Sequence, residues 1–151
     1  MAESILILPT YKPATEPYPI QVPEIQTGDT YYFTTESGLK YQVRFGKKRD
    51  NYLGNIVNFS VLSEEFEDEY SETNRGEIYK VIATVIEIIR IFHNHHKHSD
   101  TYEFTGEFKE TKDNREASIR TRLYYKYAQM ILNPMWKPFL EGNKVIVKKV
   151  G

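Results

Sequence analysis

Thr73-Asn74-Arg75-Gly76-Glu77-Ile78-Tyr79-Lys80-Val81-Ile82-Ala83-Thr84-Val85-Ile86-Glu87-Ile88-Ile89-Arg90-Ile91-Phe92 is the most apolar long segment of the chain. Its Ile and Val content is typical of a strand, but its polar residues recur at the helical steps of four, three and three. These polar residues are Lys80, Thr84, Glu87 and Arg90. We therefore predict a helix over residues 75–95 with one polar face. The wide apolar arc indicates burial on more than one side, through Ile78, Val81, Ile82, Val85, Ile88, Ile89 and Phe92.

The composition describes one domain of ordinary size. A chain of 151 residues with 40% hydrophobic residues is long enough for one core and short for two. Its net charge of −1 excludes a global attraction to nucleic acid or an anionic membrane. The lack of cysteine excludes disulfides and thiolate chemistry. Because only Ile5 to Leu8 form an apolar run before Pro9, we expect no signal peptide or membrane span and a cytoplasmic location.

Residues 1–29 contain five of the seven prolines, which forbid a helix and favour an extended course. One interpretation is a disordered leader. We favour an arm that lies along a neighbouring subunit, since a flexible linker rarely needs the apolar residues found between the prolines. The residues that we expect to bind a partner are Ile5, Leu6, Ile7, Leu8, Tyr11, Tyr18, Ile20 and Val22.

Three strands are predicted between this arm and the helix. Residues 30–35 and 39–45 form a hairpin around the turn Glu36-Ser37-Gly38, and the second strand alternates apolar and polar residues. A third strand covers residues 55–62. Residues 64–72 follow, with six acidic residues in nine, and we interpret them as a solvated loop.

After the helix we predict a strand at 101–106, a second helix from residue 113 or 114 to 132, and a short strand at 144–149. Trp136, Pro138 and Phe139 are assigned to the loop before the last strand. The first helix joins strands three and four, which suggests a right-handed crossover onto a mostly antiparallel sheet. The predicted fold is α+β, a mixed α/β sandwich, with the arm at 1–29 and a single domain at 30–151.

Four histidines lie in the six residues at the predicted end of the first helix: His93, His95, His96 and His98. Neutral imidazoles bind zinc or nickel, but this spacing fits no standard site. Cationic groups are also favoured at a helix C-terminus by the dipole. We therefore predict no metal site here and keep the four histidines as weak candidates.

Two stretches resemble small proteins of unknown function from tailed phages and bacterial genomes. The first, Gly76 to Ile86, carries a "VxATV" pattern, and the second, Arg120 to Lys126, carries "RxRLY". A Tyr-Glu-Phe-Thr-Gly strand lies between them. The resemblance covers roughly residues 30–150 in arrangement.

The same arrangement resembles the C-terminal two-thirds of the GNAT acetyltransferase fold. There a helix N-terminus after three strands binds the pyrophosphate of acetyl-CoA, and a later helix carries a Tyr that serves as general acid. By position the resemblance implies Asn74, Arg75 and Gly76 for the cofactor loop and Tyr124 for the acid. This chain, however, has Glu77 and Ile78 where the family's loop needs a second small residue, and a carboxylate repels phosphate. The resemblance therefore implies a degenerate GNAT-like domain with no cofactor.

A nucleic-acid interpretation would use two groups of basic residues with tyrosine faces for stacking. They are Lys47, Lys48 and Arg49, and the strip Arg115, Arg120, Arg122 and Lys126. That strip can equally pair with the acidic residues 64–72, within this chain or across a subunit contact. Arg120 and Arg122 are therefore also candidate partner-binding residues.

These patterns favour a non-catalytic assembly protein that contacts other subunits through its arm, in a homo-oligomer or a larger assembly. The most plausible setting is a tailed-phage virion, or a phage-associated component in the host cytoplasm. A GNAT-like acetyltransferase that uses acetyl-CoA is the alternative, and a nucleic-acid-binding accessory protein is the second.

Overall fold

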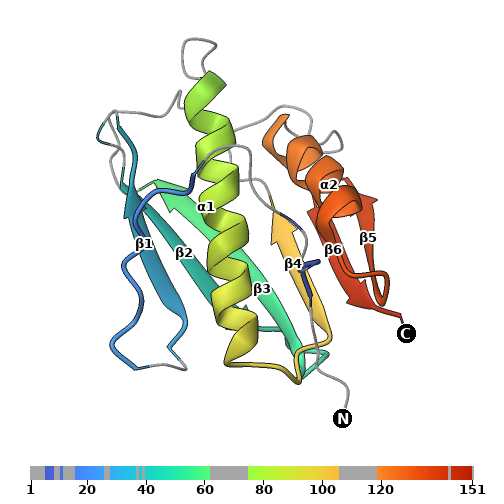
Figure 1. Cartoon of the computed structure of the whole chain (residues 1–151). Coiled ribbons are helices and arrows are strands. Elements are labelled where there is room, and N and C mark those ends of the chain that lie inside the picture. The colour runs from blue at the N-terminus through green and yellow to red at the C-terminus, as the bar shows by residue number, and fades with distance from the viewer. Residues whose placement is uncertain are drawn as a thin grey trace. The chain divides into compact units, whose positions relative to one another are not determined.

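The computed structural model describes residues 6–8, 11, 16–25, 28–36, 38, 40–61, 75–105, 119–142 and 144–150 (Figure 1). Side chains are described within these ranges except at 59–61, 75–78, 105, 119–121 and 123. The elements in chain order are β1 (Thr30–Thr34), β2 (Lys40–Lys47), β3 (Gly54–Val61), α1 (Arg75–Asn94), β4 (Thr101–Thr105), α2 (Ile119–Ile131), β5 (Trp136–Glu141) and β6 (Lys144–Lys149).

The six strands form one mixed sheet in the order β1-β2-β3-β4-β6-β5. β1 pairs antiparallel with β2, and β6 pairs antiparallel with both β4 and β5. β3 and β4 run parallel over four residue pairs, from Gly54↔Thr101 to Val57↔Phe104. α1 connects these two parallel strands, because a parallel pair needs a crossover rather than a tight turn. The prediction of a mixed α+β fold is confirmed at this level.

By contacts between Cα atoms the chain divides into two compact units, which are described separately below. The α1 unit contains Lys12–Arg44 and Phe59–His95. The α2 unit contains Met1–Tyr11, Phe45–Asn58 and His96–Gly151. The predicted arm, 1–29, therefore contributes residues to both units.

The core of the α1 unit lies between α1 and the aromatic residues of the first hairpin. Phe33 and Tyr41 stack with ring centroids 4.9 Å apart. The predicted helical period is confirmed, since the residues of the predicted apolar face with described side chains are buried, but one of the four polar residues is fully buried as well: Thr84 has 0% exposure. The predicted polar face of α1 is therefore covered at Thr84. The buried apolar residues of α1 include Val81, Ile82, Val85, Ile86, Ile88, Ile89 and Phe92.

In the α2 unit, α2 packs on β5 and β6, as the orange helix and red strands of Figure 1 show. The buried face of these strands carries Trp136, Val145 and Val147. Tyr102 of β4 lies beside them, with its ring centroid 6.1 Å from that of Trp136. Phe45 meets the edge of the Tyr102 ring at 6.5 Å.

β5 corrects the prediction, which placed Trp136, Pro138 and Phe139 in a loop. Glu141 pairs with Lys144, so Gly142 and Asn143 alone connect β5 to β6. A two-residue hairpin loop favours positive φ, and Gly142 has a φ of 58°. Pro138 misled the assignment, because proline is excluded from central strands but tolerated on an edge strand such as β5.

Within the described ranges, neither α1 nor α2 has the length and apolar composition needed to cross a bilayer.

Candidate functional site

Residues 16–25 of the predicted arm belong to the α1 unit and pack on its helix and on β1. The backbone N–H of Tyr18 donates a hydrogen bond to Thr84 Oγ1 at 2.8 Å, and that hydroxyl donates in turn to the Lys80 carbonyl at 2.7 Å. The Tyr18 ring stacks on Phe33 at 5.9 Å, and Lys80 Nζ lies 4.6 Å from the ring centroid. With 4% of its surface exposed, Tyr18 is an anchor in a specific seat on α1 and β1.

A second contact of the arm covers the edge of β1. Gln21 and Tyr32 exchange two backbone hydrogen bonds, with N···O distances of 2.8 and 3.1 Å. In an antiparallel ladder the next arm residues to donate toward β1 would be two positions away on either side. Those positions are Pro19 and Pro23, which have no N–H. The arm therefore forms one bridge with β1 and cannot extend it into a strand.

The first part of the arm packs in the α2 unit. Leu8 N donates to the Ile131 carbonyl at 2.8 Å, and Asn133 N donates to the Leu6 carbonyl at 2.9 Å. The side chains of Leu6 and Ile7 are buried by this contact. Of the predicted partner-binding residues, Leu8, Tyr11 and Ile20 are half-buried, Val22 is 56% exposed, and Ile5 lies outside the described residues.

The α2 unit contains a buried carboxylate that two lysines share. Glu103 on β4 is 8% exposed. Its Oε1 lies 2.7 Å from Lys48 Nζ, and its Oε2 lies 3.2 Å from Lys144 Nζ. Lys48 follows β2 and Lys144 begins β6, so one carboxylate ties three segments together.

Electrostatics keep this cluster ionised. Burial raises the pKa of Glu103, but the hydrogen bonds and the positive charges of Lys48 and Lys144 together lower it by more, so the pKa lies below its ordinary value. The hydrogen bond to Glu103 raises the pKa of Lys48. Both shifts move the pKa values further from neutral pH, whereas a general acid or base is most effective with a pKa near the working pH. The cluster is therefore suited to holding strands together.

A polar network fixes the loop before β3 against the loop before β4. Asn51 Nδ2 donates to Asp100 Oδ1 at 2.9 Å, and Asn51 Oδ1 accepts from Leu53 N at 3.0 Å. Asn55, which is buried, donates from Nδ2 to Ser99 Oγ at 2.9 Å. These side chains satisfy one another, as buried polar groups must.

The residues implied by the GNAT resemblance are divided between the units. Tyr124 lies buried on α2, with Ala128 and Ile131 also buried on that helix. Arg75 and Gly76 begin α1 in the other unit, and Asn74 lies outside the described residues. Neither unit by itself therefore contains the whole predicted set.

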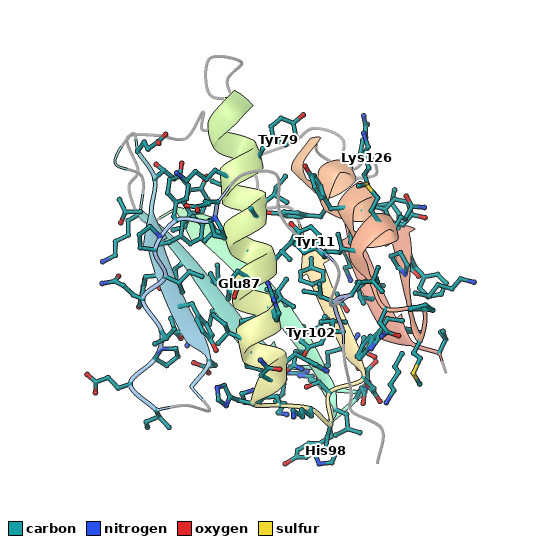
Figure 2. All side chains as sticks on the ribbon, viewed as in Figure 1. Tyr11, Tyr79, Glu87, His98, Tyr102 and Lys126 are labelled. Atoms are coloured by element: carbon teal, nitrogen blue, oxygen red, sulfur yellow. The ribbon has the colours of Figure 1, made fainter. Side chains whose placement is uncertain are left out.

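The four histidines lie on both sides of the C-terminus of α1, which ends at Asn94. His93 is buried in the last turn, His96 is half-buried, and His95 and His98 are exposed, with His98 in the loop after the helix (Figure 2). In the described parts of the chain, no group of three His, Cys, Asp or Glu residues is arranged to hold a metal ion.

The predicted basic residues have different surroundings. Lys48 is taken up by Glu103, while Lys47 lies over the exposed Tyr52 ring at 5.1 Å. Arg122 and Lys126 are exposed on α2, where Figure 2 labels Lys126. The side chains of Arg115 and Arg120 lie outside the description, and Arg49 is exposed.

The sequence did not predict that Thr84 accepts a hydrogen bond from the arm, or that Glu103 pairs with two lysines. Alternation with Tyr102 and Phe104 places Glu103 on the opposite face of β4, but alternation does not reveal which lysines reach it.

No protein-family model matches the chain, and no curated protein or solved structure is significantly similar to it.

Proposed function

We propose that this protein is a non-catalytic assembly component that contacts neighbouring copies of itself by exchanging its N-terminal arm. The observation that carries the proposal is the seat of Tyr18, which binds an extended proline-rich segment through a buried ring and a hydrogen bond to Thr84. An identical neighbour presents an identical seat. Exchange of the arm between copies would therefore preserve each of these contacts.

The prolines favour such an exchange. They restrict the free arm to extended conformations, so less conformational entropy is lost when it binds. The single bridge to β1, at Gln21, makes this part of the arm easier to release than a full strand would be. The resemblance of the Gly76–Ile86 and Arg120–Lys126 stretches to tailed-phage proteins favours a virion or phage-associated assembly as the setting.

Light scattering coupled to size exclusion tests this proposal across a range of protein concentrations. We expect the full chain to form oligomers and the Tyr18→Ala variant to be a monomer at the same concentration. A chain starting at Asp29 is the second variant, and a circular dichroism melt checks that each variant is folded. Equal masses for the full chain and both folded variants would contradict the proposal.

The alternative is a GNAT-like acetyltransferase. One observation favours it: three strands, then α1, a parallel strand and a helix with Tyr124 follow the order that the resemblance implies. A ligand that binds only the native state raises its melting temperature. A rise of several degrees with acetyl-CoA, absent with adenosine, would support the acetyltransferase.

A further inference from the structure

The face of β4, β6 and β5 that turns away from Tyr102, Val145 and Val147 carries a group of lysines. The register places Lys137 opposite Lys148, Phe139 opposite Ile146, and Glu141 opposite Lys144. All three lysines are exposed. We call this surface, formed by Lys137, Phe139, Glu141, Lys144, Ile146 and Lys148, the lysine face.

Lys137 and Lys148 form a like-charge pair. Like charges directly opposite each other on one face of an antiparallel pair are destabilising. Lys144 is compensated by Glu103, whereas within the described ranges no carboxylate pairs with Lys137 or Lys148. An anionic partner lying across these strands would remove the repulsion.

The lysine face also offers apolar contact. Phe139 is 39% exposed, and Ile146 beside it is half-buried. The β5–β6 hairpin contains four lysines and one glutamate, although the whole chain has a net charge of −1. The surface therefore fits a segment that combines carboxylates with aromatic side chains.

The outer edge of β5 is less suited to a partner than its face. With a two-residue loop after Glu141, the odd-numbered residues of β5 bond to β6, and Trp136, Pro138 and Leu140 turn their backbone outward. Pro138 has no N–H, and Trp136 N already donates to the Asn133 carbonyl at 2.8 Å. Leu140 thus remains the one outward donor of this strand, which is too few for strand addition.

We infer that the lysine face binds residues 64–72 of another copy of this chain. Those nine residues contain six carboxylates, two aromatic residues (Phe66 and Tyr70) and no basic residue. Their charge and composition complement the lysine face, and the structure does not describe them. The inference rests on the proposed assembly and names a second contact in it.

The test compares two charge-reversed variants of the full chain by sedimentation velocity. Lys137→Glu with Lys148→Glu should raise the dissociation constant of the oligomer about tenfold or more, because attraction becomes repulsion. The matched control, Arg44→Glu with Lys97→Glu, changes the same charge at two exposed positions outside every proposed contact and should leave that constant within about twofold. Mixing the first variant with Glu67→Lys, Asp68→Lys, Glu69→Lys protein should restore association.

Each other outcome overturns the inference in a recognisable way. An unchanged constant in the Lys137/Lys148 variant, while Tyr18→Ala still dissociates the oligomer, rejects the lysine face and leaves arm exchange standing. A monomeric wild type rejects both. Tight binding of a fluorescent oligo-dT to the wild type, lost with Lys137 and Lys148 reversed, would make the surface a nucleic-acid site instead.

Discussion

The two units bury a polar group in different ways. In the α1 unit, the neutral hydroxyl of Thr84 links the Tyr18 N–H to the Lys80 carbonyl. In the α2 unit, the charged Glu103 is held between Lys48 and Lys144. Two hydrogen bonds through a neutral hydroxyl have little desolvation cost, and their strength does not depend on pH. A buried ion pair has a large desolvation cost, and its strength depends on pH. The first arrangement therefore suits a contact that must be released and remade, and the second suits a permanent one.

The units also protect their sheet edges differently. The edge of β1 is covered by Gln21 of the arm, and the edge of β5 is blunted by Pro138 within the strand itself. The protection of β1 is lost when the arm is released, whereas Pro138 is part of β5 and stays in place. Arm release would thus expose a pairing site on β1 alone.

The largest expected effect comes from removing the anchor of the arm. Tyr18→Ala should lower the free energy of unfolding by about 3 kcal/mol, because a buried aromatic side chain is lost. Tyr79→Ala, which removes an exposed tyrosine, is the matched control and should cost less than about 0.5 kcal/mol. Urea unfolding measures both. Equal losses would mean that Tyr18 is not anchored.

The next largest effect comes from the ion pair. Glu103→Gln should cost about 2 kcal/mol, because two charge-assisted hydrogen bonds are weakened. Glu141→Gln on the exposed end of β5 is the control. A double-mutant cycle with Lys48→Met isolates the coupling between Lys48 and Glu103. A coupling of zero would show that the two side chains act independently.

Thr84→Val should have a smaller effect on stability, about 1 kcal/mol, because it removes one neutral hydrogen-bond acceptor from a buried N–H without changing shape. Hydrogen exchange at the Tyr18 amide should become faster in this variant. Thr84→Ser, which keeps the hydroxyl, should exchange like the wild type. Unchanged protection in Thr84→Val would remove Thr84 from the seat.

The smallest expected effect is a difference in how the stability contributed by Glu103 and by Thr84 depends on pH. The pKa of Glu103 is lowered on folding from its ordinary 4.5, so its contribution is present above that value and is lost as the pH falls through the folded pKa. The pKa of Lys48 is raised above 10.5, so its contribution is present below 10.5 and is lost as the pH rises through the folded pKa. Melts across pH 2–12 should show smaller losses at both ends for Glu103→Gln, and parallel curves for Thr84→Val and wild type. A Thr84→Val curve that differs in shape would contradict the comparison.

The sequence predicted most elements because their periods are strong. The helix period placed α1, with an end at Asn94 instead of 95, and alternation at Tyr41, Val43 and Phe45 placed β2. The missing pieces depend on tertiary partners. The sequence places Thr84 among the polar residues of the helix but does not show that the arm lies on it. It likewise does not show that residues 136–141 pair with β6, so it assigns them to a loop. Which lysines pair with Glu103 depends on the order of the strands in the sheet, and the periodicity of apolar residues does not determine that order.

Disulfide trapping at the Gln21–Tyr32 bridge tests the exchange of the arm most directly. The chain has no cysteine, and hydrogen-bonded antiparallel pairs bring Cα atoms to about 5.5 Å, within reach of a disulfide. Mass-tagged Gln21→Cys protein is mixed with Tyr32→Cys protein, refolded together and oxidised, with Tyr52→Cys as an exposed control partner. Exchange predicts a mixed dimer with Tyr32→Cys well above the control. No excess over the control, with a fully intramolecular disulfide in the double variant, would contradict it.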